Sequence, residues 1–311
     1  MRVIFMGTPD FAVETLEEII KAGHEVVLVV SQPDKAVGRS RALKYTPVKA
    51  CAVSHGIEVF QPEKIKDASS VAYLQKYPAD IMIVVAFGQI ISREILQMTK
   101  YGCVNVHASL LPKYRGAAPI QWAVINGDAV TGVTTQRMDE GIDTGDMILK
   151  EEVEIRPDET GGSLFERLST VGAKLCVRTM KAIEEGTAVY TPQNPAEATH
   201  TGKIHKELGN IDWSDDAGRI ECLIRGLNPW PSAYTRLDNK TLKIWRAQVV
   251  SDEKTAEPGC IVKVTKDAIW VQTGSGVLSL LEVQLEGKKR MTAEAFLNGY
   301  AVEEGTYLKR G

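Results

Sequence analysis

Short apolar runs alternate with amphipathic segments through the first half of the chain. The apolar runs are rich in β-branched residues and lie at residues 2–7, 24–31, 80–88 and 101–109. Between the first two, residues 11–23 place apolar side chains at helical spacing. Short buried runs separated by helical segments are typical of βαβ units. The pattern therefore predicts an α/β domain, Rossmann-like, with a mostly parallel sheet.

The pattern changes after residue 189. Residues 190–206 are rich in proline, threonine and small residues and show little apolar periodicity, which indicates a linker between domains. From residue 207 a helical stretch is followed by strand-like runs that turn residues separate. We therefore expect an α/β domain at residues 1–189, a linker at 190–206 and a small antiparallel OB-like β-barrel at 207–311.

Composition and charge narrow the class of protein. The 311 residues are 44% hydrophobic and 25% charged, which excludes a disordered chain. A formal net charge of -3 excludes a uniformly basic surface for nucleic acid. The five cysteines are scattered without paired spacing, so the sequence suggests neither a disulfide framework nor a zinc site. With no leader-like segment and no apolar run near the roughly 20 residues that span a bilayer, we expect a cytoplasmic protein that has no membrane partner.

The first turn lacks the fingerprints of nucleotide binding. Gly7, Thr8 and Pro9 follow the first apolar run, where a Rossmann protein binds phosphate. Pro9 stands where GxGxxG has its middle glycine, and no GxxxxGK[ST] motif occurs. We interpret this segment as a tight turn, which disfavours an NAD-dependent dehydrogenase and a P-loop ATPase.

Asn105 and His107 are polar residues inside the apolar run at 103–108. Because alternate residues of a strand share a face, both side chains should project from one face near the carboxyl end of the strand. An amide and an imidazole placed there could polarise a carbonyl group together. The alternative is a satisfied core histidine with a loop-capping asparagine. The proline-ended loop that follows favours a functional pair.

A second polar segment, residues 138–146, contains four acids and two glycines after a strand-like run. Its spacing does not match a calcium-binding EF-hand, and a tight turn with solvated acids is the simplest interpretation. One of the acids could instead orient or protonate His107.

These segments together resemble a known family. Residues 105–128 (NVHASLLPKYRGAAPIQWAVINGD) and 138–146 (MDEGIDTGD) resemble the folate-dependent formyltransferases. Residues 5–12, 31–39 and 226–234 resemble the members of that family that act on methionyl initiator tRNA. The resemblance runs over nearly the whole chain.

The resemblance implies transfer of a formyl group from 10-formyltetrahydrofolate to the α-amino group of methionyl initiator tRNA, for translation initiation, with no metal. It places a catalytic trio on Asn105, His107 and Asp143 and assigns catalysis to residues 1–189. In such a reaction Asn105 and His107 would donate to the formyl oxygen, while Asp143 pairs with His107 and orders a water that relays protons. The residues implied for folate binding follow two strands and are Ser109, Leu110, Leu111, Pro112, Phe87 and Gly88.

A local cluster of cations lies between residues 35 and 57, which contain no Asp or Glu. Phosphates are natural partners of such a cluster, although a solvated charge run is the usual interpretation. The resemblance implies that a loop here holds the acceptor end of tRNA and that residues 207–311 contribute to tRNA binding. The implied tRNA contacts are Lys35, Arg39, Arg41 and Lys44. We expect a monomer.

Two other functions fit part of the sequence. Another 10-formyltetrahydrofolate-dependent formyltransferase, with glycinamide ribonucleotide or an amino sugar nucleotide as acceptor, would share the segments at 105–128 and 138–146. A purine-pathway enzyme of this kind would have little use for the second domain. A non-catalytic RNA-binding protein would have no use for Asn105, His107 and Asp143 together.

Overall fold

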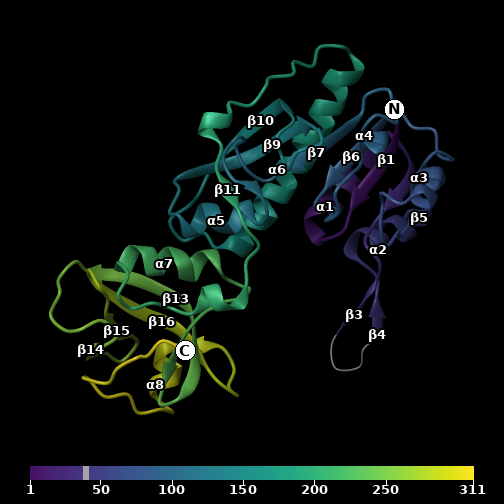
Figure 1. Cartoon of the computed structure of the whole chain (residues 1–311). Helices are drawn as coiled ribbons and strands as arrows, with labels where there is room; N and C mark the ends of the chain where they lie inside the picture. Colours follow the sequence, from purple (N-terminus) through teal and green to yellow (C-terminus); the bar gives the residue numbers. More distant parts are fainter. Residues whose placement is uncertain (38–41) are drawn as a thin grey trace. The chain divides into compact units, whose positions relative to one another are not determined.

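The computed structural model describes residues 1–37 and 42–311 (Figure 1). The chain folds into two compact units, each assembled from separate stretches of sequence. The first comprises Met1–Gly116, Val130–Glu154 and Phe165–Thr201, and the second Ala117–Ala129, Ile155–Leu164 and Gly202–Gly311. Within the described ranges, no helix combines the length and the apolar character needed to cross a membrane.

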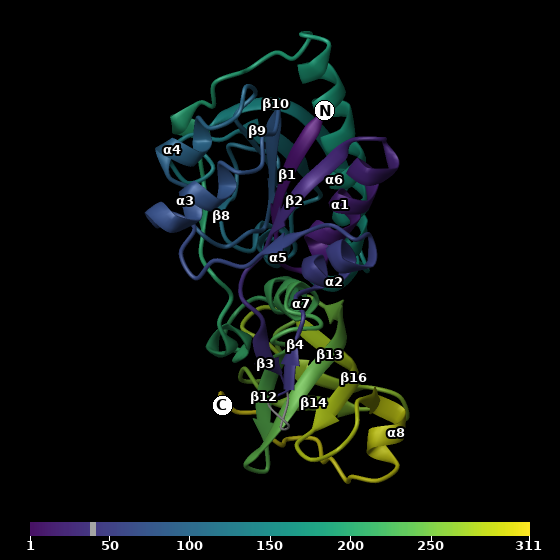
Figure 2. The same cartoon turned by 90° about the vertical axis from the view of Figure 1, so that its right-hand side faces the viewer.

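A seven-stranded sheet forms the centre of the first unit (Figure 2). Its order is β10-β9-β7-β6-β1-β2-β5; the five strands from β7 to β5 are parallel, whereas β9 and β10 are antiparallel to their neighbours. The strands are β1 (Arg2–Gly7), β2 (Glu25–Val30), β5 (Val59–Phe60), β6 (Ile81–Val85), β7 (Cys103–His107), β9 (Val130–Arg137) and β10 (Asp146–Glu154). The mostly parallel α/β sheet predicted from the apolar runs is confirmed.

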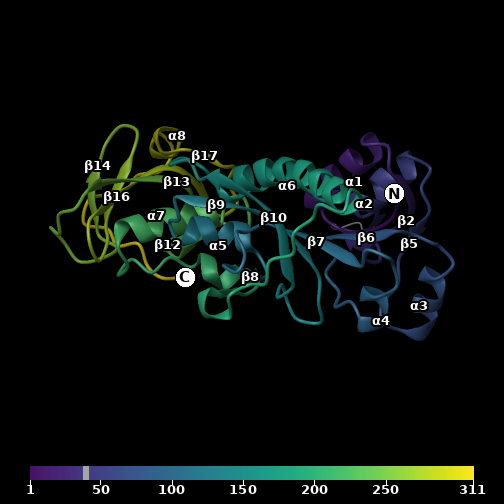
Figure 3. The ribbon, with the colours of Figure 1, turned by 90° about the horizontal axis from the view of Figure 1, so that it is seen from above.

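Helices cover both faces of this sheet: α1, α2 and α6 lie on one face, and α3 and α4 on the other (Figure 3). The helices are α1 (Asp10–Lys21), α2 (Pro47–Ser54), α3 (Ala68–Leu74), α4 (Arg93–Leu96) and α6 (Gly161–Glu184), the last beginning in the second unit. Alternate strand residues, among them Met6 and Met82, pack with Leu74 and Ile95 beneath α3 and α4. Cys103 of β7 belongs to the same cluster. Asn105 and His107 therefore project from that face, farther along β7.

Two short ladders accompany the main sheet. One is the antiparallel pair β3 (Lys35–Val37) and β4 (Ala42–Lys44), which directly precedes α2. The other is the parallel pair β8 (Arg115–Gly116) and β11 (His200–Thr201). A short 3-10 helix, Pro195–Glu197, precedes β11.

The second unit is built on an antiparallel sheet of order β12-β13-β16-β15-β14, with β17 paired to β16. Apolar residues of these strands and of α7 form its core, including Ile220, Leu242, Leu280 and Val283. Its elements are α5 (Pro119–Ile125), the 3-10 helix Lys206–Gly209, α7 (Ala217–Gly226), β12 (Ala233–Leu237), β13 (Lys240–Ser251), β14 (Ile261–Val264), β15 (Ile269–Gln272), β16 (Val277–Leu285), β17 (Met291–Thr292) and α8 (Ala293–Leu297). The predicted second, antiparallel β domain is confirmed.

The end of the chain bridges the two edges of this sheet. In the described part of the chain β12 and β14 are not paired with each other. Arg236 of β12 exchanges backbone hydrogen bonds with Lys309, while the Ile261 N–H of β14 donates to the Thr306 carbonyl. The edge strands β12 and β14 are therefore connected by isolated backbone bridges to the last residues of the chain, and not by a strand pair of their own.

Candidate active site

Asn105 and His107 occupy the carboxyl-terminal half of β7, between β6 and the antiparallel β9. Both side chains are nearly buried, with 8% and 7% of the residue exposed. In the register of β7 and β9, Asn105 lies opposite Gln136 and His107 opposite Thr134. A polar group buried in the centre of a sheet must find a hydrogen-bond partner, and here the partners come from neighbouring loops.

Asp143, in the loop between β9 and β10, joins the two residues. Its Oδ1 accepts from Asn105 Nδ2 at 3.3 Å and from Gln136 Nε2 at 2.9 Å, and lies 3.5 Å from His107 Nδ1. Its Oδ2 accepts from the Gly116 backbone N–H at 2.9 Å. The structure thus brings Asn105, His107 and Asp143 together, although 38 positions separate the first and last of them.

His107 is held from both sides of its ring. Nε2 lies 2.9 Å from the Tyr114 carbonyl oxygen. A carbonyl can only accept, so Nε2 carries a hydrogen and donates it. Nδ1 faces Asp143, and the two form an ion pair when Nδ1 is also protonated. The ring is therefore fixed in orientation, as an acid–base group requires.

Two of the residues that hold the site have left-handed backbones. Asp143 has φ 54° and Tyr114 φ 59°. Non-glycine residues adopt such angles only when their surroundings enforce them, and these positions cluster at functional sites. Gly145 permits the close return of the loop, because a Cβ there would lie 1.8 Å from the Arg137 carbonyl oxygen.

Gln193 holds the backbone of the loop that contains Asp143 in position through hydrogen bonds. Its Nε2 donates to the carbonyl oxygens of Asp143 and Gly145, each at 2.8 Å. Its Oε1 accepts from Arg115 Nε at 3.0 Å and from Arg115 Nη2 at 2.8 Å. Gln193 and Arg115 are 8% and 7% exposed, so this network is shielded from solvent, where hydrogen bonds to a charged group are strong.

The segment that contains Gln193 also fixes the strand residues around the trio. Thr199 accepts from the Tyr114 N–H through Oγ1 and from the Arg115 N–H through its carbonyl, both at 2.8 Å. β11 then pairs with β8, and the Gly116 N–H of β8 donates to Asp143. The residues expected to form a linker therefore support the candidate site.

Sequence reasoning did not identify Gln136, Gln193 or Arg115 as part of the site. The sequence does carry a signal for Gln136, because it is a large polar residue within the strand-like run before residue 138. The sequence carries no such signal for Gln193, because residues 190–206 are irregular and no periodicity predicts that Gln193 lies beside Asp143.

The residues predicted for folate binding lie in the loops after β6 and β7, which end at the same edge of the sheet. Ser109 is fully buried and its Oγ donates to the Lys113 carbonyl at 2.6 Å. Phe87 is buried in the core, whereas Gly88 is exposed with φ 87°. Leu111 and Pro112 are buried, and Leu110 is half-buried.

The predicted tRNA contacts fall partly on described residues. Lys35 and Lys44 are both exposed and lie opposite each other in the β3–β4 ladder. Like charges directly across a ladder repel, and a bound phosphate would relieve that repulsion. Arg39 and Arg41 lie outside the described residues.

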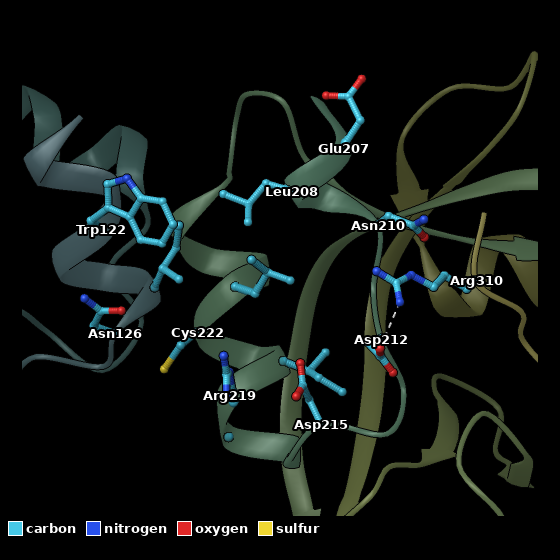
Figure 4. Close-up of a pocket in the computed structure, with 14 residues that line it drawn as sticks. Trp122, Asn126, Glu207, Leu208, Asn210, Asp212, Asp215, Arg219, Cys222 and Arg310 are labelled. Atoms are coloured by element: carbon cyan, nitrogen blue, oxygen red, sulfur yellow. Dashed lines mark hydrogen bonds and ion pairs between the residues drawn. The ribbon is translucent and has the colours of Figure 1, made fainter. Parts of the chain in front are cut away.

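A cavity of about 770 Å³ lies in the second unit (Figure 4). None of the residues predicted individually to be catalytic, to bind folate or to contact tRNA lines it. Its charged lining mixes both signs, including an ion pair of Arg310 with Asp212 at 3.1 Å. A phosphate ligand would meet the carboxylates of Glu207, Asp212 and Asp215 there, so this cavity does not suit one.

Comparisons with known proteins cover both units. A formyl transferase family model matches residues 1–180, and a formyl transferase C-terminal domain model matches residues 203–301. A methionyl-tRNA formyltransferase of Agathobacter rectalis is 68% identical over 308 residues, 99% of each chain. One from Lachnospira eligens is 54% identical over 313 residues, again 99% of each.

The fold is also found among solved structures. A sugar 3N-formyl transferase, crystallised in the presence of dTDP and 5-N-formyl-THF, superimposes with a TM-score of 0.68 and 20% identity. The match covers 93% of this chain and 99% of that one. At this identity the comparison shows the fold alone.

Proposed function

This chain belongs to the methionyl-tRNA formyltransferase family, and from that premise we propose that Asn105, His107 and Asp143 carry out its reaction. The enzyme transfers a formyl group to the α-amino group of methionyl initiator tRNA. The proposed formyl donor is 10-formyltetrahydrofolate. The observation that carries the proposal is the contact of one partly buried carboxylate, Asp143, with both Asn105 and His107.

Asn105 suits the stabilisation of a developing oxyanion. When an amine attacks the formyl carbon, negative charge grows on the formyl oxygen, and a fixed N–H donor lowers the energy of that state. Asn105 Nδ2 has two hydrogens, and one of them goes to Asp143. The Asp143 contact orients the amide, so its second hydrogen can be offered to substrate without reorganisation.

His107 and Asp143 suit the proton transfers. A free α-amino group has a pKa near ~8, so a proton must leave the nitrogen as it attacks and another must reach the departing folate nitrogen. We propose that His107 moves these protons through a water that Asp143 orders. Because the Tyr114 carbonyl occupies Nε2, the nitrogen that exchanges these protons in the proposal is Nδ1, on the side of the ring that faces Asp143.

The loops after β6 and β7 suit a flat heteroaromatic donor. Buried Phe87 and Leu111 give an apolar support, and the exposed backbone at Gly88 leaves polar groups free for a ring with several nitrogens. In this proposal Ser109, Leu110 and Pro112 shape the loop that lies beside the donor.

Charged tRNA is proposed to bind through local cations. The chain as a whole has a charge of -3, so phosphate contacts must be concentrated at a few places such as Lys35 and Lys44. The proposal includes Arg39 and Arg41 and contributions from residues 207–311. We propose that the enzyme acts as a cytoplasmic monomer.

The test is formyl transfer from 10-formyltetrahydrofolate to charged initiator tRNA, with free methionine as the control acceptor. The wild type should formylate the tRNA, and His107→Ala should lose about 10²–10⁴ in turnover with folate affinity retained. Full turnover by His107→Ala would overturn the assignment of the trio. Neither a different acceptor nor a purely RNA-binding role is favoured by the relatives that match across the whole chain.

A further inference from the structure

A glutamate, a cysteine and a histidine meet on helices that carry no residue proposed for formyl transfer. Glu17 lies on α1, Cys51 lies on α2, and His55 directly follows α2. One ligand atom from each lies within 4.8 Å of the other two. Among residues 1–37 and 42–311, no other set of three His, Cys, Asp or Glu side chains gathers this closely.

The Glu17 carboxylate is the centre of this cluster. Cys51 Sγ donates to its Oε1 at 3.1 Å, and His55 Nε2 lies 3.1 Å from Oε1 and 3.0 Å from Oε2. In a tetrahedral zinc site with ordinary bond lengths, oxygen, nitrogen and sulfur ligands stand about 3.3–3.6 Å apart. Small side-chain rotations would therefore carry the three atoms onto one ion.

The helices α1 and α2 hold the backbones of the three residues in fixed positions. Cys51 and His55 are four positions apart and share one side of the last helical turn. The start of α2 is capped by Thr46, whose Oγ1 accepts from the Lys49 N–H at 3.2 Å. Cys51 is 9% exposed, while the side chains of His55 and Glu17 are 34% and 47% exposed. An ion can therefore reach the cluster from solvent through the exposed side chains of His55 and Glu17, while burial holds the Cys51 sulfur in a fixed position.

We propose that Glu17, Cys51 and His55 bind one thiophilic divalent cation, for which zinc is the best match. Carboxylate oxygen, thiolate sulfur and imidazole nitrogen are the ligands that zinc takes in proteins, and three of them leave a fourth position for water. A bound ion would join α1 to α2, and α2 directly follows the β3–β4 hairpin.

Binding must displace a proton from the thiol. Burial and the neighbouring Glu17 raise the pKa of Cys51 to about 12, so the metal-free thiol is protonated. Hydrogen bonds from Cys51 and His55 hold the pKa of Glu17 below its usual range, so the carboxylate is already charged. The dication replaces the thiol proton, which leaves to solvent, and forms a metal–sulfur bond. The two resulting negative ligands balance its charge.

The experiment is a titration of the chelator-treated full chain with Co²⁺, a spectroscopic substitute for Zn²⁺. We expect one equivalent to bind with a thiolate-to-cobalt absorption band, and Zn²⁺ to displace it and to raise the unfolding temperature. Cys51→Ser should abolish the band, and His55→Gln should weaken binding by about tenfold or more. The matched control is Cys222→Ser, which removes a half-buried cysteine of the second unit and should leave the titration unchanged.

The proposal fails if the wild type shows no thiolate band, or if Cys51→Ser binds cobalt as the wild type does. The second result would identify an adventitious ion only. Circular dichroism of each variant comes first. If Cys51→Ser does not fold, His55→Gln alters only a partly exposed side chain and decides the question. Since the readout is spectroscopic, its outcome is independent of the formyl-transfer assay.

Discussion

Replacing Gln193 by alanine is predicted to damage catalysis more than substrate binding. The change removes two hydrogen bonds to the carbonyl oxygens of Asp143 and Gly145 and leaves the buried Arg115 guanidinium without its acceptor. At about 1 kcal/mol for each neutral bond and about 1.5–3 kcal/mol for the charged pair, partly replaced by water, unfolding should become easier by about 2–4 kcal/mol. Thermal unfolding measures this loss.

The catalytic effect follows from the backbone of Asp143. Its φ of 54° depends on the surrounding bonds, and without Gln193 the carboxylate can move relative to Asn105 and His107. A displacement of about 1 Å costs on the order of 100-fold in rate, so kcat should fall about 10- to 100-fold. Because Gln193 is not among the residues proposed to contact tRNA or folate, KM for both should stay within about twofold.

Gln193→Glu separates positioning from stability. Glutamate keeps an acceptor for Arg115, so much of the stability should return, but it offers no N–H to the Asp143 carbonyl. Its kcat should therefore remain low. Glu197→Gln, an exposed change four residues away, is the matched control and should behave as the wild type. A Gln193→Ala enzyme with lowered thermal stability but at least half of the wild-type kcat would refute the positioning role.

Three further predictions concern the site, the cations and the second unit. Asn105→Ala should lower kcat by about 10²–10³ with little change in folate affinity, measured in steady state. Lys44→Ala should raise KM for charged tRNA and reduce the slope of log KM against log salt by about one. Leu280→Ala, in the core of the second unit, should cost about 2–5 kcal/mol in urea unfolding.

A fourth prediction concerns the pH dependence of the stability of the fold. The hydrogen bonds of Arg290 hold the pKa of Glu282 below its usual range, so this pair stabilises the fold above the unfolded pKa and loses its effect as the pH falls through the folded value. Glu282→Gln should cost about 0.5 kcal/mol at pH ~7 and nothing below pH ~3.

Each of these predictions has a control variant or an outcome that would contradict it. Lys174→Ala, an exposed lysine of α6 outside the proposed tRNA contacts, should leave KM for tRNA unchanged, and equal salt slopes for the Lys44 and Lys174 variants would contradict the proposed contact at Lys44. Val249→Ala, at a position 36% exposed, should cost little next to Leu280→Ala. Turnover by Asn105→Ala above a tenth of wild type would remove the oxyanion role. A Glu282→Gln penalty that is the same at both pH values would mean that it is not electrostatic.

The sequence predicts the strands that carry the site, because a strand buried on both faces of a sheet appears as a continuous run of apolar residues. β7 was expected at residues 103–108 and is found at Cys103–His107. Asn105 and His107 were detectable because they interrupt that signal, and the acidic loop with Asp143 was detectable by its glycines and carboxylates.

The supporting residues depend on tertiary contacts that no local pattern encodes. Gln193 lies 50 positions from Asp143, in a segment with no periodicity. Glu17 and Cys51 are 34 positions apart on two helices, and only the packing of α1 against α2 brings them together. The bridging of β12 and β14 by the last residues of the chain is another such contact.

Asp143→Asn tests the central claim most directly. Asparagine is nearly the same size and tolerates the left-handed backbone, so the variant should fold while the negative charge beside His107 is lost. The measurement is the single-turnover rate of formyl transfer to charged initiator tRNA at saturating folate. If Asn105, His107 and Asp143 act as proposed, the rate falls by about 10²–10⁴ with unchanged folate affinity. A rate within about twofold of the wild type would contradict the account.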